Sequence, residues 1–261
     1  MPVAEVLAIL LAGVAAGTIN TIVGSGTLIT FPTLLFFGYP PLVANMSNNI
    51  GLLPGGVSGA YGYRRELNGQ AAVLRRLLPM SLLGGVTGAG LLLWLPARVF
   101  DTIVPALIGL GLALVFFGPG MQRRAAAHHD AVAHDAVPLK GSRRLLLPAG
   151  IFLAGIYGGY FGAAQGVILV GLMSVLMAET LQVINAVKNI LGLAVNAVAA
   201  VVFVAARGGQ IDWAVAALIG LGSLAGGVIG ARVGRRLPPG RLRAVIIIVG
   251  SVAILRLTVL R

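Results

Sequence analysis

The chain has 261 residues, of which 58% are hydrophobic and only 10% are charged, whereas soluble domains average roughly 45–50% apolar and about 25% charged residues. A mean hydropathy of +0.98 and 38 glycines without a three-residue period exclude a disordered chain, a coiled coil, collagen and an ordinary cytosolic enzyme. The composition therefore predicts an integral protein of the lipid bilayer. Because the chain has no cysteine, disulfides and iron–sulfur clusters are excluded as well.

The net charge is 19 − 7 = +12, and the basic residues form short clusters between apolar stretches. This distribution is typical of cytoplasmic loops under the positive-inside rule, so we expect no nucleic-acid partner. The first five residues lack the basic region of a signal peptide, and the first apolar segment is expected to be retained.

Ten apolar segments follow one another along the chain, and they predict an all-α fold. They cover roughly residues 3–23, 27–37, 43–63, 73–95, 99–118, 148–164, 167–178, 183–206, 211–231 and 242–260. A spanning helix needs about 20 apolar residues, so 27–37 and 167–178 are predicted to be short broken or re-entrant helices.

One long polar segment divides the chain almost in half. We expect a first transmembrane repeat over 1–118, a cytoplasmic linker loop over 119–147 and a second repeat over 148–261. The linker contains His128, His129 and Asp130, followed by His134 and Asp135. These residues have the types of a metal cluster, but their Ala-rich, Pro-flanked surroundings favour a solvated linker, so neither a metal nor another cofactor is expected.

The two halves resemble each other, which predicts an internal repeat. A shift of 142 residues places Gly13 on Gly155, Gly24 on Gly166 and Gly84 on Gly226; a shift of 141 places Asn48 on Asn189 and Ser47 on Lys188. Each repeat has five segments, an odd number, so the second repeat should be inverted.

Loop charges agree with inversion. Four arginines (64, 65, 75 and 76) follow the third segment, whereas in the second half the arginine cluster (232, 235, 236, 241 and 243) follows the fourth segment. Under the positive-inside rule the basic face is cytoplasmic, and both termini are predicted to lie outside. Inverted repeats with interrupted segments are typical of transporters, in which the interruptions form the binding site.

The candidate site residues lie at these interruptions and in the segments that follow. Ser25 and Thr27 in the first interruption, and Gln165 in the second, would offer donors to an anion beside helix N-termini. Asn48, Asn49, Lys188 and Asn189 would line the opposite wall, because polar residues inside membrane segments are costly unless used. Close packing of glycines, helix-to-helix asparagine bonds and a snorkelling Lys188 remain the alternatives; Gly84-Gly85 and Gly226-Gly227 are interpreted as packing residues.

The chain also resembles a known family. The run Gly13…Gly17…Gly24-Ser25-Gly26…Pro32…Gly38…Ala44-Asn45…Ser47-Asn48, followed by Tyr61-Gly62-Tyr63 and an Arg-rich loop, resembles the TauE/SafE family of sulfite exporters and toluene-sulfonate uptake permeases. The likeness extends over nearly the whole chain, although Asn20 and Ser25-Gly26-Thr27 stand where the family is usually richer in glycine. The resemblance implies passage of sulfite, a sulfonate or a related oxyanion across the bacterial inner membrane.

These observations predict a multi-pass inner-membrane carrier for a small sulfur-containing anion, more an exporter than an importer, and not an enzyme. The seven acidic residues all lie in loops or at segment junctions, so an intramembrane proton relay is not expected. A carrier for a different solute and a non-transport membrane scaffold remain the rival interpretations. Substrate, direction, ion coupling and oligomeric state, including a homo-oligomer, are left open.

Overall fold

The computed structural model describes residues 1–132, 142–233, 244, 246–248 and 251, and this part of the chain is helical apart from short connections. Its elements are α1 (Val3–Ile22), α2 (Thr27–Phe36), α3 (Pro41–Gly51), α4 (Leu53–Gly62), α5 (Ala71–Trp94), α6 (Ala97–Val132), α7 (Ser142–Tyr160), α8 (Gln165–Leu176), α9 (Leu181–Arg207), the 3₁₀ turn η1 (Gly208–Gln210) and α10 (Trp213–Val233). The predicted all-α class is confirmed for the described residues.

Within the described residues, five helical stretches are long and apolar enough to cross a membrane: Val3–Ile22, Ala71–Trp94, Ala97–Gly118, Leu181–Gln210 and Trp213–Val233. Thr27–Phe36, Leu145–Tyr160 and Gln165–Leu176 are shorter apolar helices, two of which are the predicted broken segments. Large apolar side chains such as Trp94 and Phe116 point outward, as lipid-facing residues do. Most of the predicted last segment, 242–260, lies outside the described residues.

Two boundaries differ from the sequence prediction. The segment predicted over 43–63 is two helices, α3 and α4, joined at Leu52. Pro54 is the cause, because its nitrogen has no hydrogen to continue the helical bonding, while proline is well suited to the first turn of the next helix.

The polar segment after 118 is not a loop over its whole length, since α6 continues to Val132. Three successive alanines, 125–127, favour this extension. His128, His129 and Asp130 belong to it, whereas His134 and Asp135 lie outside the described residues. Among the residues that the structure describes, no group of three histidine or acidic residues is placed to hold a metal.

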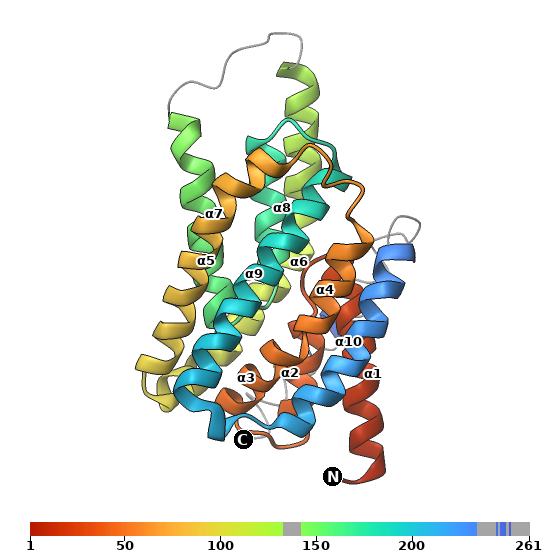
Figure 1. Ribbon diagram of the computed structural model, residues 1–261, viewed down its shortest axis with the longest axis vertical. Helices are drawn as coiled ribbons and strands as arrows, with labels where there is room; N and C mark the ends of the chain where they lie inside the picture. The colour runs from red at the N-terminus through yellow and green to blue at the C-terminus, as the bar shows by residue number, and fades with distance from the viewer. Residues whose placement is uncertain (133–141, 234–243, 245, 249–250, 252–261) are drawn as a thin grey trace.

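Two glycine-rich helix pairs frame the molecule, α5 with α7 on one side and α1 with α10 on the other (Figure 1). A Cβ added to Gly88 of α5 would lie 2.0 Å from the carbonyl oxygen of Ile156, and one on Gly226 of α10 would lie 2.1 Å from that of Val14. The helices approach this closely because these positions have no side chain. The interpretation of Gly84-Gly85 and Gly226-Gly227 as packing residues is confirmed, because a Cβ at any of the four would lie 2.1–2.7 Å from an atom of another helix.

Two buried serines attach these pairs to the helices that surround the centre of the bundle. Ser81 of α5 donates its hydroxyl to the carbonyl oxygen of Leu191 in α9 at 3.1 Å. Ser223 of α10 donates to the carbonyl oxygen of Gly51 at 2.8 Å and accepts from the amide of Gly55 at 3.1 Å. The α3–α4 junction and the middle of α9 are thereby held at the level of the two helix interruptions.

Candidate functional site

The two interrupted helices meet at their turns. α1 ends at Ile22 and α2 begins at Thr27, while α7 ends at Tyr160 and α8 begins at Gln165. Left-handed backbone conformations make both turns, with φ of +84° at Gly24, +77° at Gly162 and +63° at Ala164. Such φ values are strained for residues with a side chain, so each turn depends on its glycine.

The turns also contact each other directly. The amide of Gly166 donates to the carbonyl oxygen of Gly24 at 3.0 Å. A Cβ on Gly24 would lie 2.3 Å from the Cα of Gly166, and one on Gly166 would lie 2.4 Å from the Cα of Gly24. The available space therefore requires glycine at both positions, and at Gly24 the backbone conformation requires it as well.

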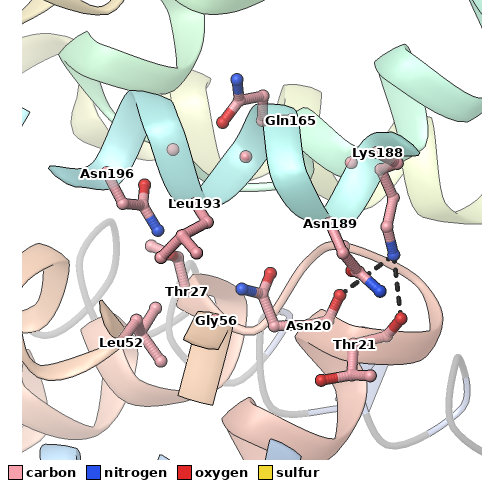
Figure 2. Close-up of a pocket in the computed structure, with 14 residues that line it drawn as sticks. Asn20, Thr21, Thr27, Leu52, Gly56, Gln165, Lys188, Asn189, Leu193 and Asn196 are labelled. Carbon is pink, nitrogen blue, oxygen red and sulfur yellow. Dashed lines mark hydrogen bonds between the residues drawn. The ribbon is translucent and has the colours of Figure 1, made fainter. Parts of the chain in front are cut away.

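A pocket opens where the turns cross, between α1, the start of α2, α4, the start of α8 and α9 (Figure 2). It comprises about 500 Å³ of space, its open side included. Its lining is largely polar or glycine: Asn20, Thr21, Gly24, Thr27, Leu52, Gly56, Gly162, Gln165, Gly166, Lys188, Asn189, Gly192, Leu193 and Asn196.

The ammonium group of Lys188 holds the end of α1. Its Nζ donates to the carbonyl oxygens of Asn20 at 3.2 Å and Thr21 at 3.0 Å, as Figure 2 shows, and the side chain is 98% buried, with only 2% exposed. The last carbonyls of a helix lack partners within the helix and carry its negative dipole end. Lys188 donates hydrogen bonds to two of these carbonyls and, when protonated, places a positive charge at the negative end of α1 and at the wall of the pocket.

The end of α7 is held in a similar way by a neutral group. The side-chain amide of Asn45 in α3 donates to the carbonyl oxygen of Tyr160 at 3.1 Å. Each interrupted helix is thus capped by a donor from the other half of the chain, but only the cap on α1 is charged.

Two amide donors of the pocket have no partner within the described part of the chain. They are Nε2 of Gln165, whose residue is 4% exposed, and Nδ2 of Asn189, whose residue is 8% exposed. A buried donor without an acceptor costs roughly 1–3 kcal/mol. Together with Lys188 they make a site rich in donors, a chemistry that suits a ligand with several acceptor oxygens.

Of the seven predicted site residues, four line the pocket: Thr27, Gln165, Lys188 and Asn189. The other three lie behind it. Asn48 donates to the hydroxyl of Thr27 at 3.2 Å and accepts from that of Thr30. Asn49 donates to the side-chain oxygen of Asn196 at 3.3 Å, and the hydroxyl of Ser25 is buried without a partner among the described residues.

Three polar lining residues were not among the predicted site residues: Asn20, Thr21 and Asn196. Asn196 follows Asn189 by seven residues, which places both side chains on one face of α9, so helical spacing could have identified it. Asn20 and Thr21 sit in the last turn of α1, and only the three-dimensional path of the turn brings them to the pocket.

Comparison with known proteins identifies the family. The family model described as "Sulfite exporter TauE/SafE" matches residues 9–257. A probable membrane transporter protein, ORF9, of Sinorhizobium sp is 31% identical over 222 residues, covering 83% of this chain and 78% of the relative.

Two further relatives extend the likeness. A probable membrane transporter protein of Haemophilus influenzae is 30% identical over 230 residues, covering 87% of this chain and 85% of the relative. The probable membrane transporter protein YfcA of Escherichia coli K12 is 28% identical over 253 residues, covering 91% and 83%. No solved structure matches the chain. On the extent of the family match, the chain belongs to the TauE/SafE family of multi-pass membrane transporters, and it is not an enzyme.

Proposed function

We propose that this transporter moves a small sulfur-containing oxyanion, of the sulfite or sulfonate class, across the bacterial inner membrane, and that the pocket between the two turns is its binding site. The observation that carries the proposal is the set of donors in the pocket: the buried ammonium of Lys188 and the unpartnered amides of Gln165 and Asn189. The description of the matching family as sulfite exporters supports a sulfur-containing ligand.

The residues in and behind the pocket would have different roles in binding. Lys188 supplies the charge that balances the anion, while Gln165 and Asn189 donate to its oxygens. Thr27 adds a hydroxyl at the start of α2. Ser25, Asn48 and Asn49 support the lining residues from behind, through the bonds to Thr27 and Asn196.

The carrier is proposed to consist of two inverted five-segment repeats, and the helix ends support this. From α1 to α7 the end of the helix moves by 160 − 22 = 138 residues, and the positive-φ glycine by 162 − 24 = 138. The serine bonds match at shifts of 223 − 81 = 142 for the donor and 191 − 51 = 140 for the acceptor. The offset between equivalent positions of the two repeats is therefore better described by 138, 140 and 142 residues in successive segments than by one constant value. The offset of 140 pairs Lys188 with Asn48 instead of Ser47.

The directions of the helices support inversion as well. α1 enters the bundle from the lower end of Figure 1 and α7 from the upper end, while α5 and α10 also run oppositely. The connection from α4 to α5, with Arg64 and Arg65, lies at the upper end. Under the positive-inside rule this end is cytoplasmic and the N-terminus lies outside, and the C-terminus is proposed to lie outside too.

The membrane potential supports export as the proposed direction. An inside-negative potential drives an anion outward by about 2.3 kcal/mol per charge per 100 mV, so facilitated exit needs no coupled ion. The two repeats are proposed to rock against each other about the pocket, exposing it alternately to either side.

The test uses substitutions that remove a donor while keeping the shape of the side chain. Gln165→Leu and Asn189→Leu each remove an unpartnered buried amide, so the unliganded protein should be as stable as the natural one or more stable. Both variants should lose the thermal stabilisation by sulfite, methanesulfonate or ethanesulfonate and the corresponding flux into proteoliposomes. Equal stabilisation of natural and variant proteins would contradict the proposed site; no stabilisation and no flux of any of these solutes would favour a different solute or a scaffold.

A further inference from the structure

Protonated Lys188 gives the pocket one positive charge. Among its 14 described lining residues, Lys188 alone has an ionisable side chain. Tyr157 and Tyr160, on the packed helix α7, do not line it. The described carboxylates nearest in sequence to the surrounding helices lie at their ends: Glu5 in the first turn of α1, Glu179 before α9 and Asp212 before α10.

The helix dipoles do not add to this charge. Two helices begin at the pocket, α2 at Thr27 and α8 at Gln165, and two end beside it, α1 and α7. A helix start carries roughly half a positive charge and a helix end roughly half a negative one. Because each interruption places an end next to a start, the partial charges cancel in pairs, and the ammonium of Lys188 is left.

From this balance we infer that the site selects anions with a single negative charge and rejects dianions of the same size. The inference rests on the proposed function and specifies its substrate class. The desolvation cost of an ion rises with the square of its charge, whereas its attraction to one fixed cation rises only in proportion. One buried ammonium can therefore balance a monoanion, while a dianion would enter with a charge left unbalanced.

For a sulfonate, which keeps one charge at all physiological pH values, the selection has no pH dependence of its own. For sulfite, whose second ionisation falls near neutral pH, the carried species is hydrogensulfite. The amides of Gln165 and Asn189 then donate to sulfonyl oxygens, and each transported solute moves one negative charge.

The test compares two ions of nearly equal size that differ by one charge, methanesulfonate and sulfate, using the full-length protein in proteoliposomes at constant ionic strength. Sulfate should compete with radiolabelled methanesulfonate about tenfold or more weakly than unlabelled methanesulfonate does. Sulfite uptake per total sulfite should fall with rising pH in proportion to the hydrogensulfite fraction. Methanesulfonate uptake over the same pH range is the control, because it reports any titration of Lys188 itself.

A charge-gain variant provides an independent arm. Leu193→Lys adds a second ammonium to the pocket lining and should narrow the preference for methanesulfonate over sulfate, whereas Leu193→Met, of similar length and neutral, should leave the preference in place. Equal competition by both ions in the natural protein would overturn the inference while leaving the anion-carrier proposal intact. If methanesulfonate, sulfate and sulfite all fail to bind, both the inference and the anion-carrier proposal are overturned.

Discussion

The contact between the two turns predicts a specific response to an added methyl group at Gly24. In Gly24→Ala the added Cβ would lie 2.3 Å from the Cα of Gly166, and the other two nearest atoms also belong to the backbone of Gly166. Inserting atoms into a packed interior costs about 1–3 kcal/mol. The φ of +84° adds about 1–2 kcal/mol for a residue with a side chain. The expected loss of stability is the sum, about 2–5 kcal/mol.

The chain offers a matched control for the backbone term. Gly38 has a φ of +87°, but a Cβ there meets nothing within 4 Å. Gly38→Ala should therefore lose only about 1–2 kcal/mol, and the difference between the two variants measures the contact between the turns.

Thermal unfolding of the purified variants in one detergent would measure this difference, and anion flux normalised to protein would show whether the crossing matters for transport. Gly166→Ala lacks the positive-φ term and should lose only the packing part, about 1–3 kcal/mol. The double variant should lose less than the sum of the two single variants, because both disturb one contact. Equal stability of Gly24→Ala and Gly38→Ala would show that the turns do not touch, and the pocket as described would not exist.

Three further predictions follow from individual hydrogen bonds. Ser223→Ala should lose about 1–3 kcal/mol of stability because two backbone groups at the α3–α4 junction lose their partner; in the same thermal assay Thr87→Ala, which removes an exposed hydroxyl bonded within its own helix, should change little. Lys188→Ala should impair anion transport at unchanged protein abundance, and unchanged transport kinetics would remove Lys188 from the site. Burial and the carboxylate of Glu5, which accepts from the Tyr39 hydroxyl at 2.6 Å, raise the pKa of Tyr39. The stability that this shift contributes should be complete below about pH 10, the ordinary tyrosine value, and should fall as the pH rises above it; Tyr39→Phe should abolish that alkaline loss in a pH series of melting curves.

Membrane segments were predictable from the sequence because length and hydropathy determine them. The turns at Gly24 and Gly162 were predictable because glycine clusters interrupt apolar runs. The break at Leu52 was missed because Pro54, which causes it, lies within a run whose overall hydropathy is that of one span.

The site was predictable in its residue types more than in its geometry. Thr27, Gln165, Lys188 and Asn189 stood out as polar residues near interruptions, and they line the pocket. That Asn48 turns away to two threonine hydroxyls, and that Lys188 reaches carbonyl oxygens of α1, depends on the crossing of helices far apart in sequence. No local pattern carries that information.

The most direct test of the central claim, that a small anion occupies the pocket between the turns, uses the absence of cysteine from the natural chain. Gly192 lines the pocket, and a Cβ there meets nothing within 4 Å, so Gly192→Cys introduces one thiol at the site without a clash. The equally unhindered Gly171→Cys on α8, away from the pocket lining, is the control. The account predicts that methanesulfonate slows labelling of Gly192→Cys by a thiol reagent in a concentration-dependent way and leaves labelling of Gly171→Cys unchanged. Labelling at position 192 that is indifferent to methanesulfonate and sulfite, in a variant that still transports them, would place the anion elsewhere.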